Sequence, residues 1–237
     1  MGKVAGMTIE GKHTSEIGLK LVSYYMPLPP VNEKIVTVPG MSGAIDATEV
    51  CAGYPTYGMR DGLKFVFQLY NDWFDFEIAK SHLAEWLHGK KVKMILDSDP
   101  AYYYVCRLKI DADKTNKVKS TITVTGYAEP MKYEITSSDE DWMWDSFSFE
   151  AGVIRELAGV EVIADNTEVI ILAGDYSTSP IFKVSESINL AVTYGGYTYP
   201  LPVGDTKIPR IRVGEEDVML VFSGQGKLDI SYRGERL

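Results

Sequence analysis

The segment DFEIAKSHLAEWLHGKKVKMILDSDPAYYYVCRL, residues 75–108, passes from the spacing of a helix to the alternation of strands. Its first apolar side chains recur at three- and four-residue intervals, which places them on one face of a helix. These side chains are Phe76, Ala79, Leu83, Trp86 and Leu87. Asp75 suits the cap at the start of this helix, and Gly89 suits a left-handed end. We expect the helix to lie across a sheet, because a lone amphipathic helix must bury its apolar face.

Most of the remaining chain has the pattern of strands. Tyr, Val, Ile and Thr alternate with polar residues and are interrupted by Gly, Pro, Asn and Asp. The runs 101–110 and 118–128, joined by the turn-forming DADKTNK at 111–117, predict a long antiparallel hairpin. Other strands of the first half are expected at 7–10, 17–25, 35–38, 63–70 and 91–96.

Charge and pattern both change near residue 135. Residues 1–134 carry 16 basic and 16 acidic side chains, whereas residues 135–237 carry 8 and 17, so the net charge of −9 comes from the second part. The acidic YEITSSDEDWMWD at 133–145 predicts an exposed connection. Strands are expected beyond it at 160–163, 167–172, 181–184, 188–194, 210–213, 218–223 and 227–232, with turns at YGGY (194–197) and SGQG (223–226). We therefore predict a mainly β protein of two domains, 1–134 and 135–237, the second an antiparallel β-sandwich.

Composition excludes several classes of protein. Without a basic excess, a dedicated nucleic-acid binder is disfavoured. The chain has no run of about 20 apolar residues and its start lacks a signal-peptide core, so we expect a soluble protein made in a cytosol, with no membrane partner. Cys51 and Cys106 lack metal-ligand spacing, and we expect both to be buried free thiols.

No group of residues predicts catalysis, a metal or a cofactor. His13, His82 and His88 have no metal-binding spacing. Asp97 and Asp99 in DSDP offer two carboxylates for acid–base chemistry, but Asp before Pro is far commoner as a turn former. We expect no enzyme, and these two carboxylates are the best candidates for the enzyme alternative.

Aromatic residues leave a carbohydrate-binding surface module as the main alternative. Trp142 and Trp144 alternate, so on an extended chain they point the same way, and Tyr197 and Tyr199 flank a glycine turn. A sugar site needs exposed aromatic faces with polar groups beside them. Packing in a core or an interface is the other explanation for the same residues.

Three stretches together resemble the distal tail protein (Dit) family of long-tailed siphophages. VPGMSGAIDATE (38–49) and SHLAEWLHGKKVKMILDSDPAYYYVCRL (81–108) are similar to its N-terminal domain, and IPRIRVGEEDVMLVFSGQGKLDISYRGERL (208–237) to its closing pattern. The positions that match its motifs, and that the resemblance marks for assembly, are Gly40, Gly43, Asp46, Thr48, Gly89, Asp99, Tyr103, Tyr104 and Arg107. Two residues depart from it: Met41 replaces a frequent basic residue, and Cys106 a frequent glycine that would allow close backbone approach.

The resemblance implies a structural protein of a phage or prophage, made in the bacterial host and located at the virion tail tip. Its N-terminal "belt" domain, of sandwich or tube type with one packed helix, would form a hexameric ring and stack on the tail tube protein. Its C-terminal galectin-like sandwich would contact receptor-binding or baseplate proteins. The tail-associated (Tal) protein would lie below the ring, and DNA would only pass through the lumen. The loop 39–62 and the hairpin 101–128 are too long for simple turns, so we expect them to form the ring.

Overall fold

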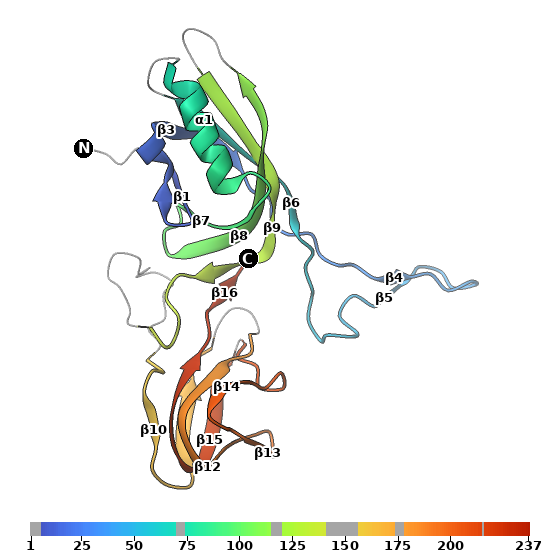
Figure 1. The fold of residues 1–237 in the computed structure, drawn as a ribbon. Helices are drawn as coiled ribbons and strands as arrows, with labels where there is room; N and C mark the ends of the chain where they lie inside the picture. The colour runs from blue at the N-terminus through green and yellow to red at the C-terminus, as the bar shows by residue number, and fades with distance from the viewer. Residues whose placement is uncertain (1–5, 70–73, 115–119, 141–155, 174–177, 215) are drawn as a thin grey trace. The chain divides into compact units, whose positions relative to one another are not determined.

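The computed structural model describes residues 6–69, 74–114, 120–140, 156–173, 178–214 and 216–237 (Figure 1). The chain forms two compact units. Unit 1 spans Met1–Lys132 together with Leu237, and unit 2 spans Tyr133–Arg236. Both consist mainly of strands, and among the described residues there is one α-helix, as the sequence predicts.

Unit 1 is built on one sheet with the strand order β2-β1-β7-β8-β9-β6-β3. The strands are β1 (Met7–Ile9), β2 (Lys12–His13), β3 (Leu19–Tyr25), β6 (Arg60–Leu69), β7 (Lys91–Leu96), β8 (Tyr102–Lys114) and β9 (Ser120–Glu134), and a short 3-10 helix, η1 (Thr14–Ile17), precedes β3. The long strands β8 and β9 are neighbours, as expected of the predicted hairpin. Residues 111–114 continue β8, so DADKTNK is not wholly a loop, and its remainder lies outside the described residues.

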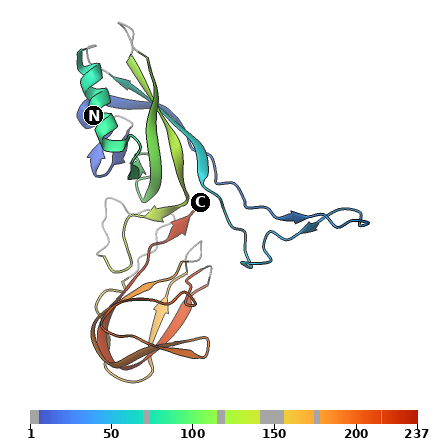
Figure 2. The same cartoon turned by 45° about the vertical axis from the view of Figure 1, so that its right-hand side comes forward.

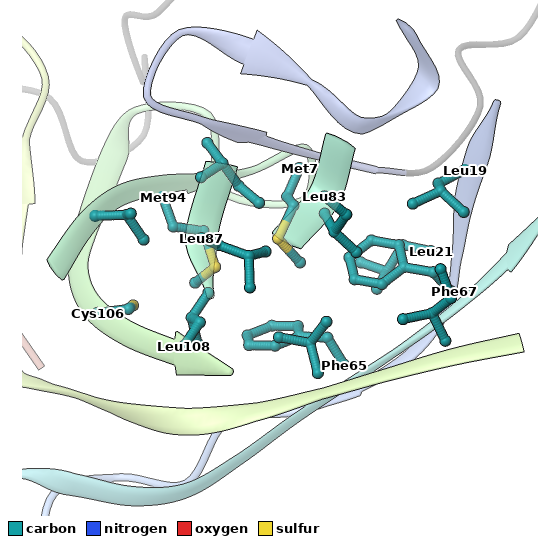
Figure 3. Close-up of a cluster of buried hydrophobic side chains, with 14 of the residues drawn as sticks. Met7, Leu19, Leu21, Phe65, Phe67, Leu83, Leu87, Met94, Cys106 and Leu108 are labelled. Carbon is teal, nitrogen blue, oxygen red and sulfur yellow. The ribbon is translucent and has the colours of Figure 1, made fainter. Parts of the chain in front are cut away.

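The helix α1 (Phe74–Leu87) covers one face of this sheet. Its predicted apolar face is confirmed: four of the five side chains are buried in the core, and Trp86 packs against the core while partly exposed. Leu83 and Leu87 lie among side chains from several strands of the sheet (Figure 3). Each such buried side chain contributes about 1.5–3 kcal/mol.

The two ends of α1 differ in how well the sequence predicts them. The helix begins at Phe74, so Asp75 lies inside it, and the prediction that Asp75 precedes it as the cap is wrong. Gly89 follows the helix with φ +74°, the expected left-handed conformation. Its N–H donates to the carbonyl of Leu108, which ties the helix end to β8.

Unit 2 contains a six-stranded sheet with the order β10-β15-β12-β13, in which β11 also pairs with β15 and β14 with β12. Its strands are β10 (Val160–Val162), β11 (Thr167–Ile171), β12 (Ile181–Tyr194), β13 (Tyr197–Pro200), β14 (Gly204–Lys207) and β15 (Val218–Ser231), and β16 (Glu235–Arg236) follows them. The sheet curls over its own buried core (Figure 2).

Two strands of unit 2 are longer than predicted. The segments 181–184 and 188–194 form one strand, β12, and SGQG lies inside β15 instead of forming a turn. The reason is close packing at two register shifts between β12 and β15. A Cβ on Gly224 would lie 2.3 Å from the Asn189 carbonyl oxygen, and a Cβ on Gly226 would lie 2.2 Å from that of Glu186. These glycines allow the two backbones to approach where the sheet bends.

Other predictions for unit 2 had mixed outcomes. The YGGY turn is confirmed, because Gly195 and Gly196 join β12 to β13 with φ +56° and +77°. The strand expected at 210–213 is wrong, since Val213 forms only an isolated bridge with Thr178. Strands β13 and β14 were not predicted.

The connection near residue 135 is more closely held than predicted. Residues 133–134 end β9, and Ser137 and Ser138 are buried. Ser138 Oγ donates to the Ile230 carbonyl at 2.7 Å and accepts from the Tyr232 N–H at 2.8 Å. The start of unit 2 is thus fixed to the end of β15. In the described ranges, no helix has both the length and the apolar character needed to cross a bilayer.

Candidate assembly site

Between β3 and β6 the chain forms a long excursion, which we call the arm and define as residues 26–59. In both ribbon views it leaves the sheet of unit 1 (Figures 1 and 2). Its short strands β4 (Ile35–Val36) and β5 (Ile45–Asp46) pair only with each other. All residues from 31 to 46 are exposed, so none of the other described segments covers this part of the arm. The arm contains most of the loop predicted to form a ring.

The matched motif in 38–49 builds the tip of the arm. The Met41 N–H donates to the Val38 carbonyl at 3.1 Å and closes a turn. Gly40 has φ +81° after Pro39, as the third residue of a type II turn requires. Gly43, with φ +90°, is also left-handed. These glycines therefore have a conformational role at the tip.

Asp46 and Thr48 close the same hairpin through side-chain contacts. The Thr48 N–H donates to Asp46 Oδ1 at 2.9 Å, and the Lys34 N–H donates to Thr48 Oγ1 at 3.0 Å. The hydrogen bonds from Thr48 hold the pKa of Asp46 below its usual value. The four matched residues of this motif thus determine the shape of the arm.

The surface of the arm is apolar to an unusual degree. Leu28 is 72% exposed and Val50 is 75% exposed. Other exposed apolar side chains of the arm are Val31, Ile35, Val36, Val38, Met41, Ile45, Tyr54 and Met59. The charged residues are limited to Glu33, Lys34, Asp46 and Glu49. Exposed apolar surface of this extent is typical of a protein interface, and a two-stranded hairpin is marginally stable alone.

Five prolines limit the conformations of the arm: Pro27, Pro29, Pro30, Pro39 and Pro55. Near the sheet, cross-links join its two legs: the Gly58 N–H donates to Pro30 and the Asn32 N–H to Thr56, both at 2.8 Å. The arm is therefore a paired structure and not an open loop.

Arg60, the first residue of β6, lies where the arm returns to the sheet and is only 3% exposed. Its Nε donates to the Pro130 carbonyl at 2.8 Å and its Nη1 to the Pro27 carbonyl at 3.3 Å. Its guanidinium carbon is 5.6 Å from the centre of the Tyr104 ring. The sequence prediction missed this residue. Its only signal was an arginine three residues before the alternating Leu63–Leu69 run.

The matched residues Asp99 and Tyr104 lie beside this anchor. Asp99 Oδ2 accepts from Lys132 Nζ at 2.8 Å and from the Tyr104 hydroxyl at 3.2 Å. Burial, with the Asp99 charge adding to it, raises the pKa of Tyr104. Lys132 Nζ also lies 4.5 Å from the centre of the Tyr102 ring.

The positions of Asp97 and Asp99, the two carboxylates of the enzyme alternative, do not support acid–base chemistry. Asp97 Oδ1 pairs with His13 Nε2 at 3.1 Å, whereas Asp99 pairs with Lys132. The two carboxylates thus have separate partners at a turn and do not face a common site. The Asp99 N–H donates to the Leu96 carbonyl at 3.0 Å, which agrees with the predicted turn.

Gly89, Tyr103 and Arg107 lie around the end of α1 and on β8. Arg107 Nη1 donates to the Gly89 carbonyl at 2.6 Å, so these two residues together hold the turn after the helix. Tyr103 lies under Lys93, whose Nζ is 5.1 Å from the ring centre. The structure thus divides the matched residues among the arm tip, the Arg60 anchor and the helix end.

The two cysteines differ in environment. Cys106 is buried, as predicted, and burial raises its pKa to about 12. Cys51 is exposed on the arm, so the prediction that it is buried is wrong.

The tyrosines proposed for sugar stacking do not present two free faces. Arg210 lies over the Tyr197 ring at 3.8 Å, and Tyr199 packs partly against the core of unit 2. Trp142 and Trp144 lie outside the described residues. Arg210 thus occupies one face of Tyr197, whose side chain is otherwise exposed, and the core of unit 2 takes up part of Tyr199.

Comparison with solved structures finds the same fold in a phage protein. The Dit protein (gp 19.1) of phage SPP1, described as a paradigm of the hub adsorption apparatus in phages that infect Gram-positive bacteria, superposes with a TM-score of 0.64. The two chains are 14% identical, and the match covers 99% of this chain and 100% of that one. A chain of the phage p2 baseplate, in its activated conformation with Sr, has 9% identity, 99% coverage of both chains and a TM-score of 0.42, too low to establish a shared fold.

No protein-family model and no curated protein matches the chain. The fold shared with SPP1 Dit confirms, at the level of the fold, the resemblance to the distal tail protein family that the sequence indicates.

Proposed function

We propose that this protein is a structural component of a phage tail tip, a hub of the distal tail type that assembles through unit 1 into a hexameric ring. The observation that carries the proposal is the arm, whose apolar side chains are not covered by any other part of the chain that the structure describes. The fold shared with SPP1 Dit supports the same function. In the ring, the arm of each copy lies on the next copy.

The arm suits a closed ring because it can supply one of the two different surfaces that a heterologous interface requires. An arm that binds a different surface on the next copy generates a ring when the rotation closes. Charge does not oppose this contact, since residues 1–134 have no net charge. The matched glycines, Asp46 and Thr48 contribute by shaping the arm, which must fit the same surface in every copy.

The finer assignments rest on the family resemblance. The ring of residues 1–134 would stack on the tail tube protein and meet the Tal protein below, and DNA would pass through its lumen without specific contacts. Residues 135–237, as a galectin-like domain, would face outward and bind receptor-binding or baseplate proteins. Their acidic composition suits a solvated position. The protein would then reside at the virion tail tip, without enzymatic activity.

Native mass spectrometry and negative-stain imaging test the ring. We expect the wild-type protein to give particles of six chains of 26.4 kDa each. Leu28→Asp and Val50→Asp, at two highly exposed sites of the arm, should abolish these particles while leaving thermal unfolding unchanged. Ile163→Asp is the matched control, since Ile163 is 78% exposed but lies in unit 2.

Two outcomes contradict the proposal. A wild-type chain that stays monomeric at every concentration is incompatible with a self-assembled ring. Rings that persist in both arm variants mean that another surface makes the contact.

A further inference from the structure

We infer that Arg60 is the residue that fixes the arm to unit 1, holding it ready for the next copy before assembly begins. This inference rests on the proposed function for the role of the arm. The attachment itself is a property of the single chain and can be tested in the monomer. Tyr104 and Asp99, which the resemblance marked for assembly, take part because the Tyr104 ring lies against Arg60 and Asp99 accepts a hydrogen bond from the Tyr104 hydroxyl.

A β-bulge directs the Arg60 side chain inward. In the pairing of β6 with β9, Arg60 lies opposite Ala128 and Leu63 opposite Gly126, so β6 advances three residues while β9 advances two. Gly62 adopts φ +77° within the bulge. In a regular strand, Arg60 and Leu63 would point to opposite faces, yet both are buried. The inserted residue thus turns an arginine into the interior, which is a known use of bulges.

Once inside, Arg60 joins three separate parts of the chain. Pro27 lies where the chain enters the arm, Arg60 where it leaves, and Pro130 in β9. The guanidinium reaches both proline carbonyls because it carries several donors in a fixed plane. The hydrogen bond to Pro27 ties the entering leg of the arm to the start of β6, and the one to Pro130 ties Arg60 to β9.

Core stability does not explain the presence of this arginine. Its Nη2 is buried and makes no hydrogen bond to the described residues, which is an unfavourable arrangement. Burial also lowers the pKa of Arg60. An apolar side chain of similar length would fill the space without these costs. Such a side chain could not bind the two carbonyls, so positioning of the arm accounts for the arginine.

The surrounding residues hold the guanidinium in place. The Tyr104 ring lies against it, and the Tyr104 hydroxyl is fixed by Asp99, which Lys132 holds in turn. A pre-positioned arm loses less conformational freedom on binding, so assembly takes place at a lower concentration.

The test measures a distance in the single chain. Spin labels are attached to Cys51, exposed on the arm, and to Ser81→Cys, exposed on α1, while Cys106 is too buried to react. Electron–electron resonance is recorded on protein diluted until it is monomeric. We expect a narrow distance distribution for the wild-type background, a broad one for Arg60→Met and an intermediate one for Arg60→Lys, which retains a donor. Lys183→Met is the control and should stay narrow, since it removes the Lys183–Asp139 ion pair, which lies in unit 2 and not in the surroundings of Arg60.

Hydrogen exchange of β6 and α1 distinguishes a loosened arm from a general loss of the fold of unit 1. Exchange there should match the wild type in Arg60→Lys, while residues 26–32 and 54–59 exchange faster. In the assembly assay, the concentration needed for half-maximal ring formation should rise about ten- to a hundredfold for Arg60→Met.

The inference is overturned if Arg60→Lys and Arg60→Met both keep the narrow distribution, or if Arg60→Met loses the whole sheet while Arg60→Lys stays narrow. A broad distribution in the wild type overturns it as well. If the wild type never forms rings but these distances behave as expected, the proposed function fails and the positioning role of Arg60 stands.

Discussion

Replacement of Gly126 by alanine tests how closely β8 and β9 approach each other. A Cβ at this position would lie 2.2 Å from the Arg107 carbonyl oxygen and 3.0 Å from the Leu108 Cα. Both atoms belong to the backbone of β8, which is held between β7 and β9. The added methyl group cannot be accommodated unless the strands separate.

The expected cost follows from two opposing effects. Alanine is ordinarily about 0.5–1 kcal/mol better than glycine inside a strand. Overpacking a dense interior costs about 1–3 kcal/mol, and a clash with rigid backbone lies at the upper end. We therefore expect Gly126→Ala to lower the free energy of unfolding of unit 1 by about 2 kcal/mol. Its thermal transition should fall by about 4–8 °C.

Circular dichroism melts, with hydrogen exchange of peptides from β8 and β9, measure this loss in the full chain. Gly58→Ala is the control, because the nearest atom to its Cβ is the Pro30 ring carbon at 3.2 Å. We expect that variant to change stability by less than about 0.5 kcal/mol. If Gly126→Ala is as stable as the wild type, the two strands do not approach as closely as the structure requires.

Two further predictions concern unit 2 and the cysteines. Burial disfavours the Asp139 carboxylate, but hydrogen bonds from Lys183 and Ser137 outweigh burial and lower its pKa from 3.8 to about 2. This stabilisation is complete above about pH 4 and is lost as the pH falls towards 2, and we expect about 1–2 kcal/mol because Lys183 is 42% exposed. Urea unfolding at pH 4 and pH 2 should show that Asp139→Asn loses less stability over this range than the wild type; equal losses refute the assignment. In a thiol-labelling assay on the native chain, Cys51 should react and Cys106 should not, so two labels per native chain refute the burial of Cys106.

Sequence pattern predicts an element best when its signal is repeated along the element. The helix α1 was predicted because several apolar residues share one face of it, and the turn at Gly195–Gly196 because two glycines meet a local requirement. Gly224 and Gly226 have the same composition as a turn, but their role depends on backbone atoms of β12 some 35 residues away in the chain. The sequence does not distinguish a glycine that lets two strands approach closely from a glycine in a turn. The prediction therefore places two strands, 218–223 and 227–232, where the structure has the single strand β15.

The candidate site shows the same limit. The residues that shape the arm tip, such as Gly40 and Asp46, act on neighbours in the sequence and belong to a short motif that could be identified. Arg60 depends on a bulge and on carbonyls at positions 27 and 130, so no local pattern marks it. Cys51 was expected to be buried because cysteines usually are, but the arm leaves it without cover.

The prolines of the arm bear on how the free protein behaves in storage. An apolar, extended segment displayed in solution is ordinarily a seed for fibrils, because its unpaired N–H groups recruit strands from other molecules. Each of the five prolines removes one such donor, three of them close together at positions 27, 29 and 30. The chain can thus keep the apolar surface of the arm exposed until the arm binds the next copy, and concentrated solutions of the protein should remain free of amyloid.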